Sequence, residues 1–206
     1  NATADLSFAN HADFDPGTGD YAVKFFTRLS NTATTQVLFD SVDSANNHVS
    51  SPTVLVYVVS GNVKVYVQGA DRITSSTALS NNVEYYIEVS RVSGTTYLFI
   101  NGVSEGTPWV SSLNMTGLKP VIGAQDAGAR YRITGYIDEW EWIKGSGGHS
   151  SGYTVPSSPS TLTGNTKALM HFSGAHASTT FTEEGGKTVI VNGTGGGVII
   201  STAYYA

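Results

Sequence analysis

The chain has 206 residues, of which 40% are hydrophobic and only 13% charged, a length and balance that suit one large all-β domain. Its formal net charge of -5 leaves no basic field for a nucleic-acid backbone, and no apolar run approaches the roughly 20 residues needed to insert across a membrane. The absence of cysteine excludes disulfides, thiolate metal sites and cysteine nucleophiles.

Runs of β-branched and aromatic residues recur along the first two thirds of the chain, separated by Gly, Asn, Asp and Ser, as is typical of short strands. Three dipeptides between runs, Gly61-Asn62, Gly94-Thr95 and Asn101-Gly102, predict hairpin turns, and Asn101-Gly102 suits type I′ best. The clearest runs span residues 21–29, 36–39, 53–59, 63–67, 83–92, 96–100, 120–124 and 131–143. The pattern predicts an antiparallel meander.

The run over residues 84–92 alternates with a period close to two, so one face packs on a core and the other faces solvent or a second layer. This alternation is typical of a sandwich. We therefore expect an all-β fold: a two-sheet antiparallel β-sandwich over residues 1–145.

Residues 146–166 are rich in Gly, Ser and Pro, which predicts a connector that lies extended on the surface. Short apolar runs return at residues 168–172, 188–191 and 198–200. About 40 residues are too few for an independent domain without metal or disulfides. We expect residues 167–206 to supply strands that complete their own sandwich or a neighbouring one.

Three stretches resemble one family when taken in order: DFDPGTGDYAVKFF at residues 13–26, YYIEVSR with TYLFING between residues 85 and 102, and VIGA with GYIDEW between residues 121 and 140. They are similar to the laminin-G-like branch of the concanavalin A-like lectin/glucanase family, in particular to domains of phage virion proteins and bacterial surface proteins. The resemblance implies a concanavalin A-like jelly roll.

The tail resembles the same family out of order. TKALMHFSG at residues 166–174 and TTFT at residues 179–182 look like the phrase that opens such a domain, and ISTA at residues 200–203 usually leads into its early strand. Two outcomes follow from this permuted order: the tail closes its own sandwich beside residues 5–9, or it completes the next copy in an assembly.

A glycoside hydrolase is the least favoured function. Retaining hydrolysis needs two carboxyls roughly 5 Å apart in a cleft, and Tyr136 stands where related glucanases carry their first glutamate. Glu139 and Glu141 can share a face, which we expect to be solvated. We predict no catalytic residue.

Asp138 is the one candidate metal ligand. The resemblance implies that this aspartate is buried near a turn and accepts backbone hydrogen bonds or faces a cation, with calcium the candidate. Calcium takes about six to eight oxygen ligands, and the other aspartates form no Asp-x-Asp-x-Asp loop. The five histidines show no zinc-binding spacing.

Carbohydrate recognition requires exposed aromatic rings beside polar groups that bond sugar hydroxyls. Trp109 follows Gly106-Thr107-Pro108 and is the best single exposed candidate, whereas Trp140 and Trp142 match core positions. The loop over residues 125–131 is the most site-like stretch of the chain. Its candidate ligand-binding side chains are Gln125, Asp126, Arg130 and Tyr131.

These features favour a non-catalytic module that binds carbohydrate or a cell-surface receptor, on a phage virion or an extracellular surface protein. Its expected partners are a glycan or receptor and copies of itself or tandem domains, without nucleic acid or membrane insertion. The alternative is a structural, self-assembling subunit of a virion decoration, fibre or extracellular filament, joined by strand exchange through the tail.

Overall fold

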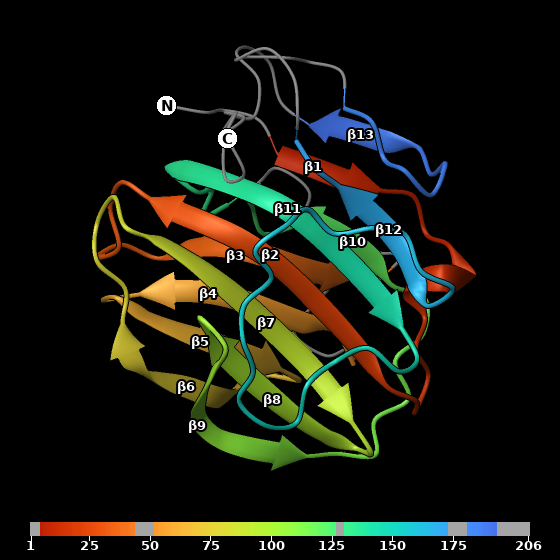
Figure 1. Ribbon diagram of the computed structural model, residues 1–206, viewed down its shortest axis with the longest axis horizontal. Helices are drawn as coiled ribbons and strands as arrows, with labels where there is room; N and C mark the ends of the chain where they lie inside the picture. Colours follow the sequence, from red (N-terminus) through yellow and green to blue (C-terminus); the bar gives the residue numbers. More distant parts are fainter. Residues whose placement is uncertain (1–4, 44–51, 127–129, 173–180, 193–206) are drawn as a thin grey trace.

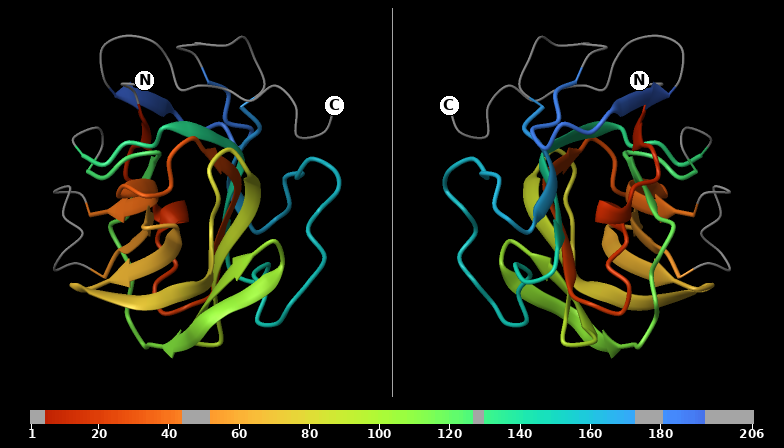
Figure 2. Two further views of the ribbon diagram at one scale, coloured as in Figure 1. Left: turned by 90° about the vertical axis from the view of Figure 1, so that its left-hand side faces the viewer. Right: turned by 90° about the vertical axis from the view of Figure 1, so that its right-hand side faces the viewer.

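The computed structural model describes residues 5–43, 52–126, 130–172 and 181–192. Within these ranges the chain forms two antiparallel sheets packed face to face, which confirms the predicted β-sandwich (Figures 1 and 2). One sheet has the order β13 (Val189–Asn192), β1 (Asp5–Phe8), β10 (Lys119–Ile122), β3 (Gln36–Val42), β4 (Val54–Val59), β5 (Asn62–Val67) and β6 (Ala70–Ala78). The other has the order β12 (Thr166–Met170), β11 (Gly135–Lys144), β2 (Tyr21–Leu29), β7 (Glu84–Val92), β8 (Thr95–Ile100) and β9 (Val103–Val110).

The central hairpins turn on pairs of residues with positive φ. Asn101 and Gly102 have φ values of 51° and 76°, as the sequence predicts for a type I′ turn. The other two turns centre one residue earlier than expected, on Ser60-Gly61 and Ser93-Gly94. In each pair the glycine takes the second position, which leaves a serine in the left-handed conformation that such turns require.

The core between the sheets is built around aromatic rings of the six-stranded sheet. Trp140 and Trp142 are both fully buried, as expected. Trp142 stacks on Tyr21 with ring centroids 5.5 Å apart, and Trp140 stacks on Phe8 at 5.4 Å. The pair thus ties β11 to both its own sheet and the opposite one.

A β-bulge interrupts the pairing of β11 with β2. Asp138 pairs with Phe26 and Glu141 with Lys24, so one extra residue is accommodated between them. Glu139 takes up the distortion with a φ of 49°. As a result the carboxylates of this stretch turn toward the outer face of the six-stranded sheet, away from the tryptophans.

The described part of the tail pairs within its own chain. Strand β12 lies beside β11, with Met170 opposite Trp140, and β13 lies beside β1, with Val191 opposite Leu6. Each sheet therefore receives one edge strand from the tail. The predicted strand at residues 198–200 and the phrase at residues 200–203 lie outside the described residues.

Residues 145–165, here called the cover segment, run across the outer face of the six-stranded sheet in front of β7 and β8 (Figure 1). The side views place the segment on the outer side of that sheet (Figure 2). The only helix in the described residues is a 3₁₀ turn, η1 (Ala12–Phe14), and none of them form a helix able to cross a membrane.

Candidate functional site

A pocket of about 360 Å³ opens on the outer face of the six-stranded sheet, at the end that the cover segment leaves free. It is built on two cross-strand rows of outward side chains from β11, β2 and β7. The rows are Tyr136–Arg28–Glu84 and Asp138–Phe26–Tyr86. Phe26, Arg28, Glu84, Tyr136 and Asp138 line the pocket together with Thr27 and Asn82.

Phe26 lines the pocket and is buried. Tyr86, also buried, packs against it with the rings 4.5 Å apart at an angle of 51°. Tyr136 is half-buried at the wall, while Arg28, Asn82 and Glu84 are exposed at the rim. A ligand here would meet a mainly polar surface, with the half-buried ring of Tyr136 at the wall and donors and acceptors at the rim.

Asp138 is the chemically unusual group of the pocket. Its side chain is buried and accepts a hydrogen bond of 2.9 Å from the backbone N–H of Glu139, as expected, although the residue lies at the β-bulge of β11 and not near a turn. Burial first, and then the charges of Glu139 and Glu84, raise its pKa to about 7. Near neutral pH the carboxyl therefore exists in both forms and can accept or donate a hydrogen bond.

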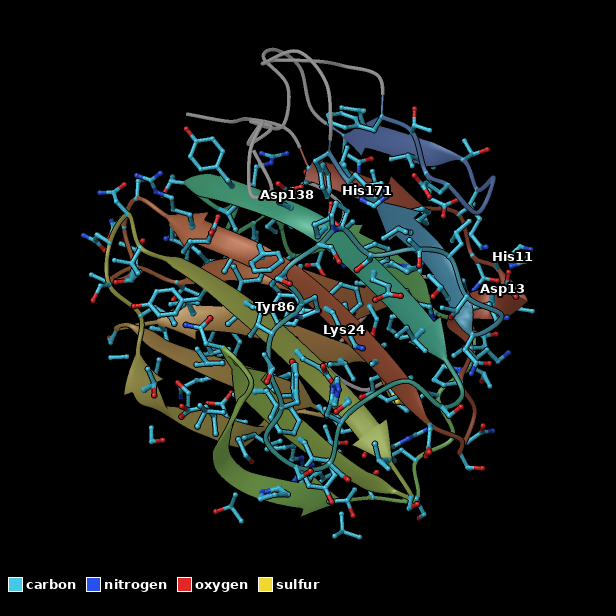
Figure 3. All side chains as sticks on the ribbon, viewed as in Figure 1. His11, Asp13, Lys24, Tyr86, Asp138 and His171 are labelled. Carbon is cyan, nitrogen blue, oxygen red and sulfur yellow. The ribbon has the colours of Figure 1, made fainter. Side chains whose placement is uncertain are left out.

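A polar cluster lies beside the pocket, where β12 ends (Figure 3). His171 contacts Glu139 Oε1 through Nδ1 at 2.6 Å and Glu184 Oε1 through Nε2 at 3.0 Å. The second oxygen of Glu139 accepts the backbone N–H of Ser160, in the cover segment, at 2.9 Å. Glu139 is thus bonded from two sides.

The carboxylates of β11 do not form the solvated face expected from the sequence. Glu139 and Glu141 are only 5% and 7% exposed. Glu141 accepts a hydrogen bond of 2.8 Å from Thr166 Oγ1 of β12. The expectation of solvent exposure is wrong because β12 and the cover segment, both distant in sequence, pack over these side chains.

Comparison with known proteins places this fold in a family. Residues 1–146 match the model of the concanavalin A-like lectin/glucanases superfamily. The chain belongs to this superfamily. The superfamily match ends just after β11, so nearly all of the cover segment and the whole tail follow it. No match is found among curated proteins.

Two solved structures superpose on almost the whole chain. A Bacteroides ovatus protein described as carbohydrate-binding superposes with a TM-score of 0.63 at 9% identity, over 96% of this chain and 61% of its own. The heptameric pentraxin of Limulus polyphemus superposes with a TM-score of 0.53 at 14% identity, over 93% of this chain and 95% of its own. The chain thus spans about three fifths of the length of the first.

The structure places Trp109 away from the pocket. It lies on β9, at the edge of the six-stranded sheet, and its ring is half-buried against the core. The guanidinium of Arg72 lies 5.0 Å from the ring centroid. The tryptophan expected to be exposed is therefore partly covered on this concanavalin A-like domain.

The predicted ligand loop lies after β10, on the other sheet. Gln125 is buried and its N–H donates to Arg130 O at 3.0 Å, while the Arg130 side chain pairs with Asp126. Tyr131 is 51% exposed. None of these four residues lines the pocket, and residues 127–129 lie outside the described residues.

Of the predicted site residues only Asp138 lies in the pocket, and the sequence analysis missed its other members. The sequence feature that could have revealed them is the pairing register of two strands. When YAVKFFTRL and EYYIEVSRV pair antiparallel, Phe26 lies opposite Tyr86 on the outward face.

Among the described residues no group of three or more His, Asp or Glu is arranged to hold a metal ion. The calcium prediction for Asp138 therefore has no supporting ligand set there.

Proposed function

We propose that this domain is a non-catalytic carbohydrate-binding module and that the pocket around Asp138 holds the sugar. The supporting observation is a concave site that combines the half-buried ring of Tyr136 with carboxyl, amide and guanidinium groups. Aromatic faces suit sugar C–H groups, and carboxyl, amide and guanidinium groups bond hydroxyls.

The charges in the pocket favour uncharged sugars. Two carboxyl groups, Asp138 and Glu84, face one guanidinium, Arg28, so a sugar carboxylate would meet net repulsion. Neutral hydroxyls can bond both carboxyls at once. The proposed ligand is therefore a neutral sugar of an extracellular glycan, and the proposed location is an extracellular or virion surface.

Hydrolysis has little support in this geometry. Glu139, Glu141 and Glu88 are buried in internal hydrogen bonds. The two carboxyls left to the pocket are Asp138, which is buried, and Glu84, at the exposed rim. A hydrolase needs both carboxyls presented to the glycosidic bond. We propose binding without turnover.

A matched pair of tyrosine variants tests the position of the site. Neutral and sialylated oligosaccharides are screened on an array, and the best ligand is titrated by calorimetry. Tyr136→Ala, in the pocket, weakens binding about tenfold or more because it removes a ring wall. Tyr131→Ala, in the predicted loop, leaves affinity unchanged.

The opposite result has a clear meaning. If Tyr131→Ala abolishes binding and Tyr136→Ala does not, the ligand binds at the loop over residues 125–131. Binding to none of the glycans, neutral or acidic, would refute the carbohydrate-binding function.

A further inference from the structure

The cover segment is far longer than its connection requires. Strands β11 and β12 are antiparallel neighbours, with Ile143 opposite Thr166, and Lys144 N donates to Asn165 O at 2.9 Å. A two-residue turn suffices to join strands paired in this way. The intervening residues instead leave the hairpin, cross the sheet and return, which is typical of loops with a role of their own.

Beneath the cover segment, the sheet face continues the surface of the pocket. The next outward row beyond Asp138–Phe26–Tyr86 is Glu141–Lys24–Glu88–Phe99. Like the pocket as a whole, this row combines carboxylates, a cation and an aromatic ring. Figure 3 shows Tyr86 and Lys24 as neighbours on this face.

The cover segment occupies the hydrogen-bonding groups of this second row. The backbone N–H of His149 donates to Glu88 Oε1 at 2.8 Å, and its Nδ1 contacts Oε2 at 2.8 Å. Lys24 Nζ donates to Gly147 O at 2.7 Å. As a result Glu88 is completely buried and Lys24 only 8% exposed.

An aromatic pair of the cover segment packs against the aromatic ring of this row. Tyr153 stacks on His149 with centroids 3.6 Å apart and meets Phe99 edge-on at 5.4 Å. Phe99 points outward from β8, and it is fully buried. Every type of contact that a sugar would make on this row, ring packing and hydrogen bonds to charged groups, is made by the chain itself.

We infer that the cover segment occupies the second half of a glycan-binding groove and thereby restricts the pocket to the end of a glycan chain. The inference rests on the proposed function, because the two rows form one surface only if the first binds sugar. The ligand class is then a terminal neutral sugar, and Tyr153 with His149 are the residues that determine this specificity.

A shortened protein tests the inference directly. Residues 145–164 are replaced by Asn-Gly, and both proteins are titrated with cello-, laminari- and chito-oligosaccharides of one to six units. The native protein reaches its full affinity with one or two units, because further units have no surface to contact. In the shortened protein affinity keeps rising with length, about tenfold or more by six units.

The two hypotheses fail in different ways. If the native protein binds and both proteins show the same dependence on length, the cover segment does not limit the groove and the inference is overturned. If neither protein binds any oligosaccharide of these series or any glycan of the array, the failure lies with the proposed function, and the inference falls with it.

A matched pair of glycine variants provides the same test without a deletion. A Cβ on Gly102 would lie 2.0 Å from Tyr153 O, whereas on Gly94 the nearest atom is Ser111 O at 3.5 Å. Both glycines hold the same turn position, with φ of 76° and 78°, so Gly102→Ala and Gly94→Ala strain their hairpins alike. Only Gly102→Ala displaces the cover segment.

The expected result is that chymotrypsin cleaves Gly102→Ala after Tyr153 about tenfold faster than Gly94→Ala, and that only Gly102→Ala gains affinity for the longer oligosaccharides. Faster cleavage with an unchanged dependence on length would overturn the inference. So would equal cleavage of the two variants.

Discussion

At the scale of single residues, Asp138 decides the chemistry of the pocket. Its carboxyl is buried and feels the charges of Glu139 and Glu84, so the charged form is disfavoured and the pKa is raised to about 7. The folded protein therefore holds a proton that the unfolded chain releases near pH 4. Stability must depend on pH through this group.

The sign of this dependence follows from the direction of the shift. A raised pKa contributes stability that is fully present below about pH 4 and is lost as pH rises through about 7. Between pH 5 and pH 8 the native protein should lose about 5 °C more in Tm than Asp138→Asn, measured by calorimetry. Burial also raises the pKa of Asp40, to about 8. Because Asp40 titrates in both proteins, its contribution cancels in the difference between their Tm profiles. Parallel Tm profiles would show that Asp138 does not carry the effect.

At the scale of elements, sequence patterns predicted the strand and turn features that depend only on residues close together in the chain. The two faces of β7 and the Asn101-Gly102 turn follow from side-chain period and backbone preference. Ile87 and Val89 enter the core while Glu88 and Ser90 meet the cover segment as a second layer, and the turn has the expected positive φ values. The exposure of Glu139 and Glu141 depends on the cover segment and β12, which come later in the chain. A composition rich in Gly, Ser and Pro predicts a connector but carries no information on where it lies.

The free edge of β12 is closed by the tail that follows it. Glu183 Oε1 accepts the backbone N–H groups of Leu169 at 2.9 Å and Gly185 at 2.7 Å, and Glu184 N donates to Leu169 O at 3.0 Å. An edge strand with unpaired backbone groups invites pairing with other chains. The tail therefore protects the sandwich at this edge.

Removing the carboxylate should open the edge. Glu183→Ala leaves the buried Leu169 amide without an acceptor, which costs about 1–3 kcal/mol. We expect hydrogen exchange at Leu169 to accelerate about tenfold or more, measured by NMR, with Thr182→Ala, an exposed neighbour, as the control. An exchange rate equal to that of the control would mean that Glu183 does not hold this edge.

At the scale of the whole molecule, the superfamily match and the fold divide the chain differently. The match ends at residue 146, yet β12 and β13 complete both sheets of the same sandwich. Sequence reasoning predicted that the tail must dock because it is too short to fold alone. It did not decide whether the tail pairs with its own sandwich or with a neighbouring copy. The pattern of a strand shows which of its faces is apolar, but not which sheet edge it joins.

One substitution tests whether the tail is part of the cooperative unit. Met170 is fully buried opposite Trp140, so Met170→Ala should cost about 2–5 kcal/mol by leaving a cavity beside that ring. Urea unfolding followed by tryptophan fluorescence should then show one transition, shifted to lower urea, because Trp140 reports the main sandwich while the change lies in the tail. Lys167→Ala removes a half-buried side chain that donates to Gly164 O and leaves no cavity beside a core ring, so it should keep the midpoint close to native. If the tail docked loosely, it would unfold first in Met170→Ala, and the tryptophan transition would keep the native midpoint. The midpoint of that transition therefore distinguishes one folded unit from two.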